Sequence, residues 1–355
     1  MTQSSQAPAA DGKIAGSAKD AGILLVRVLA HSMVAVGLLF VVNNYLNFWR
    51  GWPGLQNLFA HHGWFGVEAL RTALDSTAVT LGWVQTLTYL VPIAGIVMFV
   101  LRTPDRSLRA ESEALSALTA YIIRAAFWAI VFIGLADSVI SFLRVEGLLS
   151  QVVGQDLATD LGRSSFRGST VHYPLIGLAL VVAYFSRALG FTWLALLIVA
   201  AEMQIVLTRF VFSYEQAFMS DLVRFWYGGL FLFASAHTLL AEGHVRVDIL
   251  YAGFSARGKA WSNTVGSVVL GLPLCWVILT MGLRDKASLI NNPLLNFEVT
   301  QQGYGLYVKY FMAGFLVIYA ITMLVQFTSY FLSNVAVLVH EKSDHPAAGA
   351  QHAEI

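Results

Sequence analysis

Charged side chains are scarce in this 355-residue chain, where Asp, Glu, Lys and Arg together make up 12% of the residues. A soluble domain carries roughly 25% charged residues, which keep its surface hydrated. The apolar share is correspondingly high, at 57%. This small number of charges cannot cover a water-facing surface. The composition therefore excludes an ordinary soluble protein and predicts an integral membrane protein.

Cysteine is almost absent, and the single one, Cys275, lies in an apolar run. One cysteine forms no intrachain disulfide and cannot build a multi-cysteine metal or iron–sulfur site. The sequence also lacks a Gly-Lys-Ser/Thr phosphate loop, a nucleophile elbow and a His-Glu-x-x-His motif. We therefore predict no enzyme, no catalytic residue and no resident metal or cofactor. The net charge of +1, without a Lys/Arg stripe, predicts no nucleic-acid partner.

Long apolar runs dominate the sequence, and a helix needs about twenty apolar residues to cross a bilayer. One helix from Pro174 to Arg209 would be roughly 54 Å long, so two helices joined at 186–190 fit better. The pattern predicts an all-α polytopic helix bundle of about eight transmembrane helices. Seven remains possible and would move the N-terminus to the other side. The predicted spans are 22–43, 79–101, 118–143, 170–187, 190–212, 223–241, 259–284 and 306–336.

Basic residues in short loops indicate the orientation of such a chain. With eight spans both termini lie on one side, and the basic loops Arg102/Arg106/Arg109 and Arg246/Arg257/Lys259 lie on that side too. The positive-inside rule therefore places both termini in the cytoplasm. The polar ends, 1–21 and 341–355, are predicted to be disordered tails. The aromatic segment 44–81 and an amphipathic stretch at 145–161 are expected to lie at the membrane surface.

Three motifs follow one another around the later spans. Arg-Phe-Val-Phe at 209–212 closes one span, and Asp-Leu-Val-Arg-Phe at 221–225 opens the next. After a span rich in Gly, Ala and Phe comes His-Val-Arg-Val-Asp at 244–248, with Ser255 and Arg257 just beyond. In this order and spacing, the region from Phe191 to about Leu338 resembles the small permease subunit, of Q type, of the TRAP (tripartite ATP-independent periplasmic) transporters.

The resemblance implies a non-catalytic subunit in a bacterial inner membrane. Such a subunit is a stationary scaffold for a large permease, which binds the substrate and the coupling sodium ions. A periplasmic solute-binding protein delivers the substrate, for which small organic acids are the implied class. The expected partners are thus the large permease, the binding protein and membrane lipid. The family-motif candidates for an interface are Arg209, Asp221, Arg224, His244, Arg246 and Asp248.

The sequence departs from the family pattern in two respects. Asp221 stands where the family usually has Glu, and Ser220 precedes it in place of a second acid. Typical members have four spans, so residues 22–189 form an N-terminal membrane extension of about four further helices. Residues 190–340 then form the four-helix domain that resembles the small permease. A degenerate duplication of four spans is one hypothesis for this extension.

The motif residues also have a reading from physical chemistry alone. Asp221 and Arg224 lie one turn apart at a helix start, where they can pair and where an acid suits the helix dipole. A solvated first turn is the alternative. His244, Arg246 and Asp248 alternate with valines, which suits an extended elbow docked on lipid or on a partner helix. An ordinary membrane-surface loop is the alternative.

Ionisable residues inside predicted spans are functional candidates by default. Arg27 and Arg124 lie near span ends, where snorkelling is expected, and Asp137 lies near the outer interface, where hydration is expected. Glu202 is the buried polar candidate, because it lies at mid-span and must be protonated or paired with another helix or subunit. His31 and His237 leave open a membrane redox subunit with haem. A self-sufficient secondary transporter is the other alternative, although no matched pair of Gly/Pro-broken spans is evident.

Overall fold

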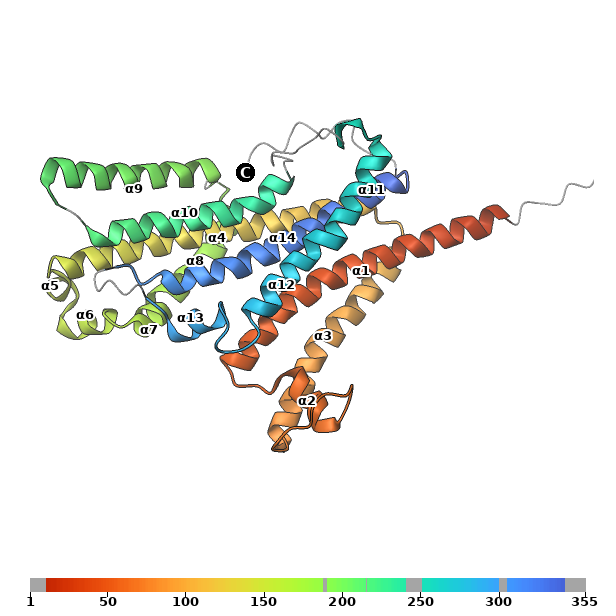
Figure 1. Ribbon diagram of the computed structural model, residues 1–355, viewed down its shortest axis with the longest axis horizontal. Coiled ribbons are helices and arrows are strands. Elements are labelled where there is room, and N and C mark those ends of the chain that lie inside the picture. The colour runs from red at the N-terminus through yellow and green to blue at the C-terminus, as the bar shows by residue number, and fades with distance from the viewer. Residues whose placement is uncertain (1–10, 188–189, 215, 241–250, 300–304, 342–355) are drawn as a thin grey trace, which may run out of the picture.

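The computed structural model describes residues 11–187, 190–214, 216–240, 251–299 and 305–341 (Figure 1). Every regular element in these ranges is a helix, which confirms the predicted all-α polytopic bundle. The elements are α1 (Asp11–Phe48), α2 (Gly54–His62), α3 (Ser76–Arg102), α4 (Leu108–Val145), α5 (Leu149–Val153), α6 (Gln155–Leu161), α7 (Ser164–Arg167), η1 (Gly168–His172), α8 (Tyr173–Phe185), α9 (Phe191–Phe212), α10 (Ala217–Leu240), η2 (Tyr251–Gly253), α11 (Ala256–Gly266), η3 (Ser267–Gly271), α12 (Leu272–Gly282), α13 (Asn291–Asn296) and α14 (Lys309–Leu338).

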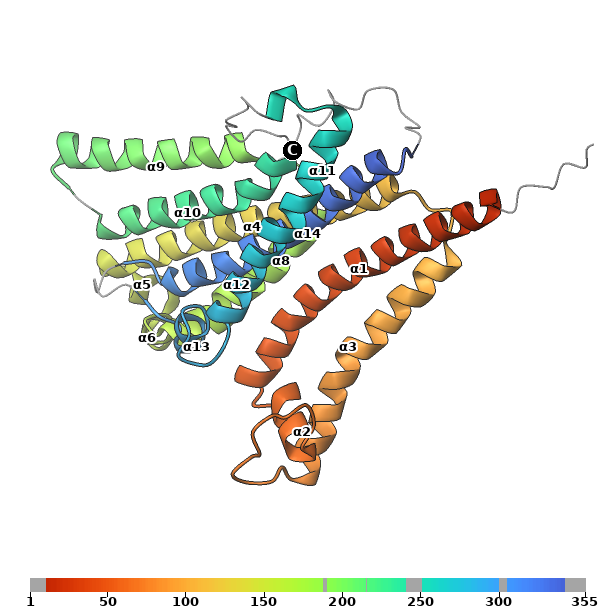
Figure 2. The ribbon, with the colours of Figure 1, turned by 45° about the vertical axis from the view of Figure 1, so that its right-hand side comes forward.

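Seven helical segments of the described chain are long and apolar enough to cross a membrane. They are α1 from Ala21, α3, α4, the continuous stretch α7 to α8, α9, the continuous stretch α11 to α12, and α14. The predicted span 223–241 corresponds to α10, which is not among the seven. Even so, α10 runs beside α4 and α14 in both views of the bundle (Figures 1 and 2).

Two helices occupy the long apolar stretch after Pro174, as predicted. Helix α8 ends at Phe185 and α9 begins at Phe191, with Ser186 already in an extended conformation. Counting α10, eight helical segments among the described residues cross the bundle. Helix α1 begins at Asp11, so the last eleven residues of the segment 1–21, which was expected to be a disordered tail, are helical.

The two described ends of the chain lie at the same end of the bundle. Arg27, in the first part of α1, is hydrogen-bonded to Glu111 in the first turn of α4. Glu341, just after α14, accepts a hydrogen bond from the backbone N–H of Leu108, 3.2 Å away, at the start of α4. These contacts bring the beginning of α1 and the end of α14 to one place, as eight alternating crossings require.

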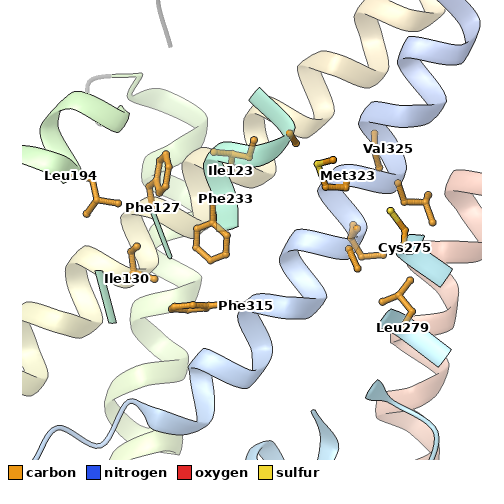
Figure 3. Packing of buried hydrophobic residues seen from close by; sticks show 14 of the residues in the cluster. Ile123, Phe127, Ile130, Leu194, Phe233, Cys275, Leu279, Phe315, Met323 and Val325 are labelled. Atoms are coloured by element: carbon orange, nitrogen blue, oxygen red, sulfur yellow. The ribbon is translucent and has the colours of Figure 1, made fainter. Parts of the chain in front are cut away.

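Helices α4 and α14 form the centre of the bundle, and one apolar core surrounds them. Phe127 of α4 packs against the ring of Phe233, which packs in turn against Phe315 of α14 (Figure 3). Phe127 also packs edge-on against the ring of Phe191 in α9. The core thus includes residues from both sides of position 189. Helices α4 and α8 of the extension are part of the same packed unit as α9 to α14.

A glycine permits the closest helix–helix approach in this core. Trp226 of α10 donates its indole N–H to the backbone carbonyl of Ile130 in α4, at 2.9 Å. A Cβ atom on Gly134, one turn further along α4, would lie 2.5 Å from that indole nitrogen and 2.9 Å from Leu222. Small residues allow close backbone approach between membrane helices, and here Gly134 makes room for an aromatic ring.

Two spans contain a π-helical turn, η1 and η3. Each includes a glycine against an aromatic side chain near or on α14: Gly168 contacts Phe297 and the Tyr310 hydroxyl, and Gly271 contacts Phe327. Each π turn is followed within two residues by a proline, which has no backbone N–H to donate to the helix. Neither π turn was predicted from the sequence, and both pack on α14, η3 against Phe327 and η1 against Tyr310.

Helices α1, α2 and α3 form a hairpin at one side of the bundle (Figure 2). Gln85 of α3 joins it internally: its amide donates to the side-chain oxygen of Asn47 at 2.7 Å and accepts from the Gly54 N–H at 2.9 Å. Asn44 connects the hairpin to the bundle by donating to the Leu283 carbonyl at 2.7 Å. A cavity of about 520 Å³ lies between the hairpin and the end of α12, and Arg284 is part of its rim.

The two segments expected at the membrane surface are partly helical. Within 145–161, residues 149–153 form α5 and residues 155–161 form α6. Gly154 separates the two helices with a φ of +84°, a backbone conformation that glycine adopts without steric strain. In the segment after α1, Trp64 stacks on His62 and meets Trp83 of α3 edge-on. The predicted amphipathic stretch is therefore two short helices.

Candidate functional site

The motif residues that the structure describes lie in two helices, at the end of α9 and in the first part of α10. Arg209 lies in the last turn of α9 and is exposed. Asp221 and Arg224 lie one turn apart in α10, with 3.8 Å between their charged groups, so the predicted pair is present. The Asp221 carboxylate is nearly buried and also accepts the backbone N–H of Leu306 at 3.2 Å, which connects α10 to the segment before α14. His244, Arg246 and Asp248 lie outside the described residues.

Asp137 of α4 is the centre of a fully buried ionic cluster. Its Oδ1 accepts a hydrogen bond from Arg167 of α7 at 2.8 Å and lies 3.2 Å from Nε2 of His172. Its Oδ2 accepts the backbone N–H of Tyr307 at 2.6 Å. The side chains of Asp137, Arg167 and His172 are 0% exposed. The expectation that Asp137 is hydrated is therefore wrong, because α7, η1 and the chain before α14 cover it.

Two tyrosines extend this cluster toward α14. The guanidinium of Arg167 lies 4.0 Å from the centre of the Tyr307 ring, an arrangement of the cation–π type. The Tyr307 hydroxyl donates to the Gly162 carbonyl at 2.9 Å, and Arg144 donates to that hydroxyl. The Tyr310 hydroxyl lies 2.8 Å from Nδ1 of His172. We call Asp137, Arg167, His172, Tyr307 and Tyr310 the Asp137 cluster.

The Asp137 cluster joins the two parts of the sequence. Asp137, Arg167 and His172 come from the N-terminal extension, whereas both tyrosines belong to the region that resembles the small permease. A buried ion pair contributes little net stability by itself, but the loss of one member leaves the other charge uncompensated. The cluster therefore fixes where the extension sits against α14.

A second buried ionic cluster lies at the opposite end of α4. Arg27 of α1 donates from Nε and Nη2 to one oxygen of Glu111, at 2.9 and 2.7 Å, and from Nη1 to the Thr103 carbonyl at 2.6 Å. His31 approaches the other Glu111 oxygen at 3.3 Å. Arg27 and Glu111 are both 0% exposed. The expectation that Arg27 snorkels to water is therefore wrong, because Glu111 supplies its counter-charge within the protein.

Serine hydroxyls connect α4 to α14 between the two ionic clusters. Ser112 donates to the Ser329 carbonyl at 2.8 Å, and Ser329 donates to the Ser112 carbonyl at 2.7 Å. Ser116 contacts the Ser329 hydroxyl at 2.8 Å and accepts from the Gln326 amide at 3.2 Å. Hydroxyls and amides of this kind form hydrogen bonds between membrane helices while allowing close approach.

Glu202 lies at the middle of α9, as expected, but not between helices of this chain. It is exposed, and it makes no hydrogen bond or ion pair with any residue that the structure describes. Helix α9 packs on α10 through Leu194, Ile198 and Ala201, which occupy a different face. Hydropathy alone indicates that a residue is at membrane depth, but not whether it faces the bundle interior, which explains the difference.

The two histidines considered for haem have separate surroundings. His31 contacts Glu111 and the ring of Phe99, whose centre is 6.1 Å away. His237 packs against the ring of Phe191 at 4.8 Å between centres. No group of three or more His, Cys, Asp or Glu side chains in the described residues is arranged to hold a metal ion.

Sequence reasoning did not single out Glu111, Arg167, His172 or Tyr307. Glu111 and Arg167 lie outside the predicted spans, so they resembled ordinary loop charges. One signal was available: His172 falls within the predicted span 170–187, where an ionisable side chain needs a partner. Its partner Asp137 lies 35 residues away, a pairing that a single sequence does not reveal.

Comparison with known families matches residues 196–334 to the DctQ component of tripartite ATP-independent periplasmic transporters. This match confirms the resemblance to the TRAP small permease, and it includes most of α9, all of α10 to α13 and most of α14. It leaves the extension, with α1 to α8, outside the matched region. No curated protein and no solved structure gives a significant match.

Proposed function

We propose that the chain is the small, non-catalytic membrane subunit of a TRAP-type secondary transporter. The observation that carries this proposal is the DctQ match over residues 196–334, within a bundle of membrane-spanning helices. A large ion-coupled permease would be its partner, and a periplasmic binding protein would deliver a small organic acid to the complex. The coupling sodium ions would bind to the large subunit.

The proposed role of this subunit is that of a rigid scaffold. The buried charges Arg27, Glu111, Asp137 and Arg167 form pairs that hold helices together. The extension shares the apolar core of the DctQ-type region through α4 and α8. Such an arrangement supports a fixed platform, enlarged by the extension, against which a partner's moving domain can work.

Isolation of the complex tests the proposal. The chain carries a C-terminal tag and is extracted gently from native membranes, and co-purifying proteins are identified by mass spectrometry. We expect a larger permease of roughly a dozen spans in equal amount. Recovery of the chain alone, in a detergent that keeps other membrane complexes intact, would contradict the proposal. Uptake by the purified chain alone in liposomes would favour an independent transporter instead.

The proposed orientation places both termini in the cytoplasm. The basic loop Arg102/Arg106/Arg109 lies at the same end of the bundle as the start of α1 and the end of α14, and positive loops remain inside. A green fluorescent protein fused after Ile355 is expected to be fluorescent, whereas alkaline phosphatase at the same position is expected to be inactive. If instead the phosphatase fusion is active and the fluorescent-protein fusion is not fluorescent, the C-terminus lies outside the cytoplasm and the proposed orientation is wrong.

A further inference from the structure

Glu202 is an unsatisfied polar group at the depth where it is most costly. Helix α9 spans Phe191–Phe212, so Glu202 is at its centre. The side chain is exposed and has no hydrogen-bonding or ionic partner among the described residues. Hydrocarbon offers none, and lipid headgroups lie many ångströms away at the interfaces. A carboxyl group at this position therefore needs a donor from another polypeptide.

The residues around Glu202 form a stripe suited to helix packing. Ala195, Val199, Val206 and Arg209 flank Glu202 at alternating spacings of four and three residues, which place side chains along one helix face. The residues one turn before and after Glu202 are valines, which are shorter than the acid. We call Ala195, Val199, Glu202, Val206 and Arg209 the Glu202 face.

Arg209 does not neutralise Glu202. The two lie seven residues apart, or about 10 Å along the helix axis, and no ion pair forms between them. Arg209 lies in the last turn of α9, where a long basic side chain reaches the interface. The acid at mid-depth therefore remains without a counter-charge from its own helix.

A second copy of this chain is a poor occupant of the Glu202 face. Copies inserted in the same direction are related by an axis along the membrane normal, so each residue meets its counterpart at the same depth. Glu202 of one copy would then lie level with Glu202 of the other. Two carboxylates close together repel each other, and neither supplies the missing counter-charge.

We infer that a transmembrane helix of the large permease subunit docks on the Glu202 face and presents a hydrogen-bond-donating or basic side chain to Glu202. This inference rests on the proposed function and adds the place and chemistry of contact. The interface combines apolar contacts from the valines with one polar contact at mid-membrane. That single contact fixes the depth and rotation of the partner helix, since the donor has to be level with Glu202.

A pair of photo-crosslinking variants tests the location. Benzoylphenylalanine replaces Val206, on the Glu202 face, or Leu207, its neighbour on the opposite flank of α9. The two positions are matched because they lie at nearly the same depth and are 47% and 49% exposed. Irradiation in native membranes is expected to join the Val206 variant to the large permease, with several-fold less adduct from the Leu207 variant.

Substitution of the acid tests the chemistry. In Glu202→Leu the donor on the partner helix loses its acceptor, so co-purified permease is expected to fall by about tenfold or more. Glu202→Gln keeps an acceptor oxygen and is expected to retain more of the partner than Glu202→Leu. Because Glu202 is exposed in this chain, both variants are expected to match the wild type in yield and thermal stability when purified alone.

The outcomes separate this inference from the proposed function. If the wild type recovers a permease but Val206 and Leu207 crosslink to it equally, or Glu202→Leu retains it fully, the docking face is wrong and the subunit role stands. A Val206 adduct between two copies of this chain would equally overturn the docking face. If the wild type recovers no permease, the proposed function itself fails.

Discussion

Asp137→Ala is expected to destabilise the protein by about 3–5 kcal/mol, because it leaves the buried charge of Arg167 without a partner. The same change removes the acceptor for the Tyr307 N–H, so the segment before α14 loses its connection to α4. The unfolding temperature in detergent, followed by size-exclusion chromatography after heating, is expected to fall by about 5 °C or more.

Asp160→Ala is the matched control for that experiment. Asp160 pairs with Arg163 three residues away, but the two side chains are 37% and 64% exposed. Exposed pairs contribute about 0–1 kcal/mol, so little change is expected. A second variant, Asp137→Leu combined with Arg167→Met, removes both charges together and is expected to recover part of the lost stability. Equal stability of Asp137→Ala and the wild type would show that the Asp137 cluster is not structurally important.

Gly134→Leu is expected to disrupt the crossing of α4 and α10. Even a Cβ atom at this position would lie 2.5 Å from the indole nitrogen of Trp226, and a leucine adds three further carbons. Overpacking of a tight core costs about 1–3 kcal/mol, so Gly134→Ala is expected to lie in that range and Gly134→Leu above it. The measurement is the yield of monodisperse protein together with its unfolding temperature.

Gly95→Ala serves as the control for Gly134. Gly95 also lies inside a long membrane helix, α3, but nothing lies within 4 Å of a Cβ atom built there. Alanine is a better helix former than glycine, so this variant is expected to be neutral or slightly more stable. If Gly134→Leu is rescued by Trp226→Ala, which opens space in the same place, the clash is the cause. Similar behaviour of Gly95→Ala and Gly134→Ala would contradict the packing argument.

The membrane spans could be predicted because the bilayer imposes a length on each helix. That rule separated α8 from α9 in the apolar stretch between Pro174 and Arg209, since one helix would be far too long. The same rule predicted the span 223–241, which corresponds to α10. The DctQ-type region was predictable for a different reason, because its motifs have a recognisable order.

The ionic clusters could not be predicted, because their partners meet only through the tertiary fold. Tyr307 and Asp137 are 170 residues apart, and Arg27 and Glu111 are 84 residues apart. Local reasoning treated Arg27 and Asp137 as residues close to water, which is the common outcome near span ends. For Glu202 the depth was predictable but the direction was not, because α9 has apolar residues all round and gives no sign of its inner face.

The pairing of α4 with α14 has a consequence for how the chain is made. Helix α4 leaves the ribosome early, but Ser112 and Asp137 find their partners only when the chain near Ser329 and Tyr307 has been synthesised. At about 5–20 residues per second, the wait for Tyr307 is roughly 10–30 s. During that time we expect the insertion machinery or an insertase to keep the polar side chains of α4 out of contact with lipid. Truncated products that end before α14 are expected to be recognised as unassembled and degraded.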